Sequence, residues 1–132
     1  MKPPRPQTLL RTLGRGCTGL VAFVFIASAS VKLSGLPRVV EELHGRLGFP
    51  EATIPWLAAT QFAGLALFVF PRTAVLGGVL LTGYLGGAVA ALVRVGDPPV
   101  VPVGVALLIW LALIFREPTL LRLTPWRRRN PV

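Results

Sequence analysis

The run from residue 73 to residue 93 constrains the fold most, because it is apolar, rich in small residues and closed by a charged stop at Arg94. Residues four apart share one helix face, so small side chains at that spacing let a second backbone approach closely, as helices do in lipid. Glycine costs roughly 1 kcal/mol per residue in a water-exposed helix, which disfavours a soluble protein. The glycines predicted to make this close helix contact are Gly78, Gly83, Gly86 and Gly87.

The composition also favours a membrane protein. Of the 132 residues, 53% are hydrophobic and only 14% are charged, which is more apolar than a single soluble domain requires. The net charge of +9 does not indicate nucleic-acid binding, because the basic residues flank apolar runs and do not interleave with aromatic ones. The lone Cys17 excludes an intrachain disulfide, and no metal-ligand or catalytic motif is present, so we expect neither a metal site nor catalytic residues.

Four apolar runs predict an all-α protein, namely an integral membrane, antiparallel four-helix bundle. The expected spans are residues 14–33, 53–70, 73–93 and 100–115 of a membrane domain over 16–116, with basic tails at 1–15 and 117–132. The short turn at Pro71 and Arg72 makes the second and third spans antiparallel neighbours. The first run is short, although its flanking cations can lengthen it by snorkelling. A cleaved signal peptide is the alternative there, because Ala27-Ser28-Ala29 imitates a cleavage site.

The segment between the first two spans is amphipathic. Apolar residues from Leu36 to Leu47 fall on one helical face, while charged residues and His44, the only histidine, cover the other. Pro37 suits a first turn and Gly48 suits a stop. We therefore predict a short interfacial helix on the membrane surface, with an ordinary solvated loop helix as the alternative.

The charges predict an orientation. Four spans place both termini on one side, which then holds ten basic residues and one acidic residue. The other side holds four basic and four acidic residues. By the positive-inside rule the basic side is cytoplasmic, so both termini are expected in the cytoplasm.

Polar residues inside the spans are the candidates for a binding site, because such groups are costly in a bilayer and face the bundle interior. With a rise of about 1.5 Å per residue, Gln61 lies roughly 12 Å into its run, and Tyr84 lies roughly 15 Å from Arg94. These depths predict a polar pocket lined by Lys32, Gln61, Tyr84 and Arg94. In the alternative, Lys32 and Arg94 are interfacial anchors and Gln61 and Tyr84 only bond between helices. The anchors would then pair with acidic neighbours, namely Glu41, Glu42 or Asp97.

The string TGYLGGAVAALVRVGDP, from Thr82 to Pro98, resembles the third span of the DoxX-like membrane proteins, and AGLALFVFPRTAVLGG, from Ala63 to Gly78, resembles the family's second-span exit. The resemblance covers about residues 14–118. Related sequences often carry a glutamate where this chain has Gln61 and a histidine where it has Leu92. Both groups that titrate near neutral pH are thus absent, which disfavours a proton-coupled reaction.

The resemblance implies a protein of the bacterial cytoplasmic membrane that is an accessory subunit or assembly partner of a quinone-linked redox system and is not catalytic on its own. A carrier or binding protein for a small lipophilic molecule such as a quinone is the alternative, with no other cofactor expected. A third hypothesis is that the protein is a purely structural partner, which binds another protein through the small-residue face of the third span. The expected partners are the lipid bilayer and either a redox enzyme subunit or a second copy of the chain, with no nucleic acid.

Overall fold

A computed structural model describes residues 6–123, and within that range every regular element is a helix, which confirms the all-α prediction. The parts of the predicted basic tails at residues 1–5 and 124–132 lie outside the described residues. The elements are α1 (Pro6–Leu33), α2 (Pro37–Val40), η1 (Glu41–Arg46), η2 (Glu51–Thr53), α3 (Ile54–Val69), α4 (Ala74–Arg94), α5 (Val100–Arg116) and η3 (Pro118–Leu123).

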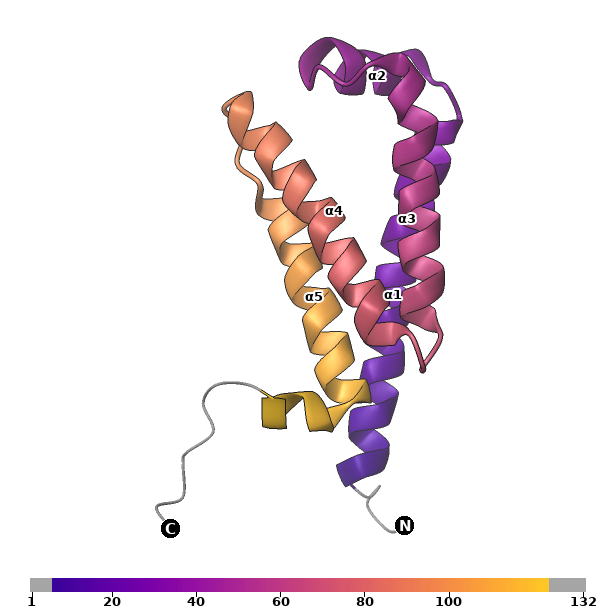
Figure 1. The fold of residues 1–132 in the computed structure, drawn as a ribbon, viewed down its shortest axis with the longest axis vertical. Helices are drawn as coiled ribbons and strands as arrows, with labels where there is room; N and C mark the ends of the chain where they lie inside the picture. Colours follow the sequence, from indigo (N-terminus) through magenta and orange to yellow (C-terminus); the bar gives the residue numbers. More distant parts are fainter. Residues whose placement is uncertain (1–5, 124–132) are drawn as a thin grey trace.

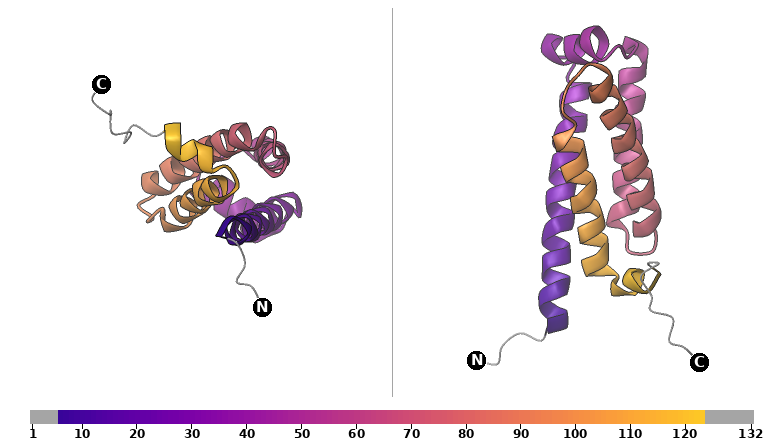
Figure 2. Two further views of the ribbon diagram at one scale, coloured as in Figure 1. Left: turned by 90° about the horizontal axis from the view of Figure 1, so that it is seen from below. Right: turned by 90° about the vertical axis from the view of Figure 1, so that its left-hand side faces the viewer.

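The four long helices contact one another in a ring. Helix α1 packs against α3 and α5, and α4 packs against the same two helices from the other side (Figures 1 and 2). The start of α1, the α3–α4 turn and the end of α5 lie at one end of the molecule, while α2, η1 and the α4–α5 loop lie at the other (Figure 1). Toward this second end, called the α2 end below, α4 and α5 diverge from α1 and α3 (Figure 1).

The helices are long and apolar enough for a membrane protein. Three of the described helical segments could cross a bilayer by length and composition, namely α1, residues 51–69 and α4, and α5 is a shorter apolar helix. Large apolar side chains point outward from them, including Phe23, Trp56 and Leu107. Such an exposed apolar surface is rare on a soluble monomer, so the fold indicates a membrane protein.

The core forms where all four long helices meet. Its fully buried side chains come from every one of them and include Val21, Phe68, Leu81, Ile109 and Leu113. Because α1 supplies part of this core, cleavage near Ala29 would remove a packed helix. Helix α1 also begins at Pro6, inside the segment expected to be a solvated tail.

Glycines make the close helix contacts, but only one of the four predicted positions does so. A Cβ on Gly78 would lie 2.5 Å from Leu113, whereas a Cβ on Gly83, Gly86 or Gly87 would meet nothing within 4 Å. The packing prediction is therefore corrected at these three glycines. Their side of α4 faces away from the neighbouring helices or toward the diverging end.

Three unpredicted glycines make contacts instead. A Cβ on Gly14 of α1 would lie 3.0 Å from Arg116 of α5. A Cβ on Gly77 would collide with the backbone of Phe68 in α3, and one on Gly64 would lie 2.7 Å from Leu81. Small residues allow close approach only where two helices actually cross, and the α3–α4 crossing lies near the turn that joins them.

The segment between α1 and α3 is helical, as expected. Helices α2 and η1 continue directly from one to the other, with Pro37 in the first turn. Gly48, with a φ of 73°, follows the helix end in the left-handed conformation that favours glycine.

Candidate functional site

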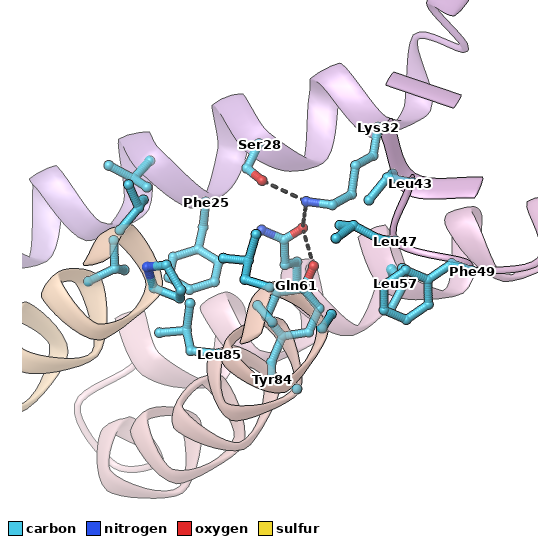
Figure 3. A pocket seen from close by; sticks show the side chains of 18 of the residues that line it. Phe25, Ser28, Lys32, Leu43, Leu47, Phe49, Leu57, Gln61, Tyr84 and Leu85 are labelled. Carbon is cyan, nitrogen blue, oxygen red and sulfur yellow. Dashed lines mark hydrogen bonds between the residues drawn. The ribbon is translucent and has the colours of Figure 1, made fainter. Parts of the chain in front are cut away.

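Three helices bring four polar side chains together near the α2 end. Lys32 of α1 donates hydrogen bonds from Nζ to Ser28 Oγ at 2.6 Å and to Gln61 Oε1 of α3 at 2.9 Å (Figure 3). Tyr84 of α4 donates from its hydroxyl to the same Gln61 oxygen at 3.1 Å (Figure 3). Ser28 and Lys32 are four residues apart and so lie on one face of α1. These four residues are called the polar cluster below.

Gln61 is the centre of this cluster. It is the one buried polar side chain among the described residues, with 2% of its surface exposed. Its carbonyl oxygen accepts both interhelical hydrogen bonds, while its amide nitrogen has no partner within residues 6–123. An ammonium group can only donate, and this fixes the orientation of the amide. The cluster therefore joins α1, α3 and α4 through a single acceptor.

The polar cluster forms part of the wall of a cavity of about 720 Å³. The cavity lies where the α1–α3 pair separates from the α4–α5 pair, and apart from the cluster its wall is almost wholly apolar. The apolar lining includes Phe25 and Leu57 beside the cluster (Figure 3) and Val101 and Val105 of α5. Few polar groups in an apolar pocket of this size are typical of a site for a small organic ligand.

The segment between α1 and α3 covers the cavity at the α2 end. Leu43, Leu47 and Phe49 line it there, opposite Asp97 and Pro98 of the α4–α5 loop. We call these five residues the roof.

Two polar interactions join the sides of the roof. Arg46 pairs with Asp97 and also with Glu42 at 2.6 Å, and Arg94 donates to the carbonyl oxygen of Leu47. The hydrogen bond that Arg46 donates to Glu42, followed by the charge of Asp97, raises the pKa of Arg46 above its ordinary value, so its guanidinium stays charged. The roof is thus connected to both halves of the molecule.

Of the four predicted pocket residues, the structure brings three together. Lys32, Gln61 and Tyr84 belong to the polar cluster, whereas Arg94 is exposed, does not line the cavity and contacts the roof from outside. Arg94 is thus corrected from a pocket residue to a support of the roof. Its position at the end of α4 puts its side chain beyond the level of Tyr84, at the surface.

The alternative for these residues is also only partly matched. Gln61 and Tyr84 do bond between helices, but among the described residues Lys32 forms no ion pair with Glu41, Glu42 or Asp97. Arg46 takes Glu42 and Asp97 instead.

Sequence reasoning missed the roof and the role of two glycines. Leu43 and Leu47 were expected to face a membrane surface, yet they line the cavity, and so do Gly83 and Gly87 of α4. The absent side chains of these glycines leave the space that the cavity occupies. The amphipathic pattern shows that one face of the 36–47 helix is apolar, but it does not show what that face covers.

The chemistry of the site is that of hydrogen-bond donation. The cluster presents an ammonium group, a serine hydroxyl and an amide nitrogen beside an apolar space. No group of three metal-ligating side chains occurs within residues 6–123, and His44 instead bonds to the carbonyl oxygen of Phe49 at 2.9 Å. The arrangement can bind a molecule with acceptor oxygens and an apolar body.

The family that the sequence motifs indicate also matches the chain over most of its length. A family model described as the DoxX-like family matches residues 16–114, most of the chain, which confirms the resemblance. No curated protein and no solved structure matches the chain.

Proposed function

The chain belongs to the DoxX-like family, and from this premise we propose that it is a multi-pass membrane protein that binds a small lipophilic molecule in the cavity between its helices. The family does not identify the ligand. The proposal rests on one observation, the polar cluster around Gln61 in the wall of a cavity that is otherwise almost wholly apolar.

We infer four antiparallel spans in the bacterial cytoplasmic membrane with both termini cytoplasmic. Helix α5 has 17 residues, about 26 Å at 1.5 Å per residue, and it packs along α1 and α4. Its outward side chains are apolar, and Arg116 at its end can reach an interface by snorkelling. These features support a fourth span.

The lipophilic character of the ligand follows from the lining and from the surroundings. The cavity wall is built mainly from aliphatic and aromatic side chains, and a molecule dissolved in the bilayer would reach such a site without crossing water. The donors of the cluster would bind its acceptor oxygens. A quinone, with two carbonyl oxygens on an apolar ring, is one molecule of this kind.

Binding without turnover fits the residues present. At the positions where related sequences often carry glutamate and histidine, Gln61 and Leu92 offer no group that gains or loses a proton near neutral pH. Both residues line the cavity. The role of an accessory subunit in a redox system stays a prediction, because it depends on the family resemblance alone.

Two adjacent glycines provide a test. Gly87 lines the cavity and Gly86 does not, and a side chain at either position meets open space next to the backbone. Gly87→Leu should therefore place a side chain in the cavity, where it would occupy space that the ligand needs. We expect the affinity for the ligand to fall at least tenfold. Gly86→Leu is the matched control and should bind like wild type.

The measurement is the affinity of the purified protein in neutral detergent for a short-chain ubiquinone analogue, together with mass spectrometry of co-purified lipophilic molecules. Equal binding by both variants, at melting temperatures equal to that of wild type, would show that the cavity is not the site. Absence of any lipophilic ligand from wild type and both variants would end the proposal.

A further inference from the structure

Lys32 lies in the cavity wall without a counter-ion among the residues that the structure describes. Within residues 6–123 its ammonium group bonds only to the neutral oxygens of Ser28 and Gln61, and it lies 6.0 Å from the centre of the Tyr84 ring. The one carboxylate among the lining residues, Asp97, is already paired with Arg46. Removing a charge from water is costly unless an opposite charge compensates it, so the site favours an anion beside Lys32.

The hydrogen-bonding groups of the cluster are likewise unbalanced. The Gln61 oxygen accepts two hydrogen bonds, whereas its amide nitrogen has no partner within residues 6–123. That nitrogen is not sealed from solvent, because no buried side-chain nitrogen or oxygen of the described residues lacks a hydrogen bond, and Gln61 lines the cavity. Lys32 has three donors and uses two of them on the cluster. The site therefore offers a ligand unused donors on Lys32 and Gln61 and one positive charge. The Gln61 carbonyl oxygen already accepts two hydrogen bonds and offers no further acceptor.

A carboxylate matches this set better than a neutral carbonyl. Its two oxygens accept several hydrogen bonds, and bonds that involve charged partners are shorter and stronger than neutral ones. The remainder of the cavity, from Phe25 and Leu85 to Val101 of α5, presents hydrocarbon. An apolar chain would lie there.

We propose that the ligand is an ionised acid with a single apolar chain, whose carboxylate binds at Lys32 and Gln61 and whose chain occupies the apolar part of the cavity. This inference rests on the proposed function and names the class of molecule that the cavity takes. It assigns Lys32 the role of counter-ion and Gln61 the role of a second donor through its amide nitrogen.

The test compares a charged probe with its neutral twin. The full-length protein is placed in phosphatidylcholine nanodiscs and titrated with dodecanoate or with methyl dodecanoate, and binding is followed by the rise in melting temperature. Dodecanoate should bind wild type about tenfold more tightly than the ester, since hydrogen bonds to charged groups are roughly twice as strong as neutral ones.

Three variants test the residues. Lys32→Gln keeps a donor but removes the charge, and Gln61→Glu keeps the shape but supplies Lys32 with an internal carboxylate in place of an amide oxygen 2.9 Å away. Both should remove the preference for dodecanoate over the ester. Arg38→Gln removes a cation from the exposed surface segment and should keep the preference.

The outcomes separate the two proposals. Equal affinity of wild type for acid and ester, with both lost in Gly87→Leu, would overturn the ionised acid but leave the lipophilic site intact. No binding of either probe would remove both proposals. Displacement of dodecanoate by phosphatidylglycerol in the nanodisc would assign the anion to a lipid head group and overturn the free acid, whereas unchanged affinity is the expected result.

Discussion

At the scale of single residues, Gln61 of α3 links three helices by side-chain hydrogen bonds. Lys32 and Tyr84 approach it from α1 and α4, and both donate to its one carbonyl oxygen, although Lys32 also donates to Ser28. Donors that are shielded from water need a partner, and in this partly buried cluster few other groups can accept their hydrogen bonds. The neutral amide of Gln61 also leaves Lys32 without an internal ion pair among the described residues. A glutamate at position 61 would form one with Lys32.

Replacing Gln61 tests this dependence. Gln61→Leu removes the acceptor while keeping much of the volume. The Tyr84 hydroxyl then loses its acceptor, at a cost of about 1 to 3 kcal/mol, whereas Lys32 keeps its hydrogen bond to Ser28. We expect a clear fall in the melting temperature of the detergent-solubilised protein. Thr60→Val is the control, because Thr60 is exposed and its hydroxyl bonds only to the carbonyl of Trp56 in its own helix. A melting temperature that falls equally in both variants would contradict the role of Gln61.

At the scale of elements, the α3–α4 pair is held close at the turn, and Arg116 of α5 binds the same region. The Arg116 guanidinium donates to the carbonyl oxygens of Phe68 and Val69 at 2.9 and 3.1 Å, where α3 ends and its carbonyls lack helical partners. Gly77 lies against the backbone of Phe68. The helices are therefore tightly fixed at this end and diverge toward the α2 end, which leaves room for the cavity.

Alanine substitutions distinguish the two kinds of glycine in α4. Gly77→Ala places a methyl group into the Phe68 backbone, which must move, so we expect a loss of about 1 to 3 kcal/mol in stability. Gly86→Ala meets open space and gains helix propensity, so the melting temperature should stay the same or rise. Thermal unfolding of both variants in one detergent measures the difference. If Gly86→Ala proved the more damaging, that face of α4 would be the buried one.

At the scale of the whole molecule, charge and shape divide between the two ends. The end with the start of α1 and the α3–α4 turn carries Arg11, Arg15, Arg72 and Arg116, of which none forms an ion pair within the described residues. At the α2 end the basic residues are balanced by acidic ones, and Arg46 pairs with two of them. This asymmetry predicts a cytoplasmic location for the first end and an external location for the roof.

Single cysteines can measure this orientation. In a Cys17→Ser background, Gly45→Cys in η1 should react with a membrane-impermeant thiol reagent in intact cells, because Gly45 is exposed and a Cβ there makes only ordinary contact with Glu41. Arg122→Cys in η3 should react only after the cells are permeabilised. The reverse pattern would invert the topology, and labelling of both in intact cells would exclude four complete spans.

The sequence by itself determined the helices, the family and the chemistry of the polar cluster. Apolar runs ended by proline, glycine and charge mark most of the helix ends, because those signals are local, although α1 begins at Pro6, before its predicted start. The depth of Gln61 and Tyr84 along their runs placed them at one level, because the helix rise is constant. Lys32 joined them as the cation at the end of its run.

Only the tertiary structure decided which faces meet. Small residues occur all around α4, so their spacing cannot tell Gly77 and Gly78, which lie at helix crossings, from Gly83, Gly86 and Gly87, which do not. The crossing of the helices, and not their sequence period, sets where backbones are close. For the same reason the roof over the cavity and the external position of Arg94 follow from how the surface segment folds back across the diverging helices.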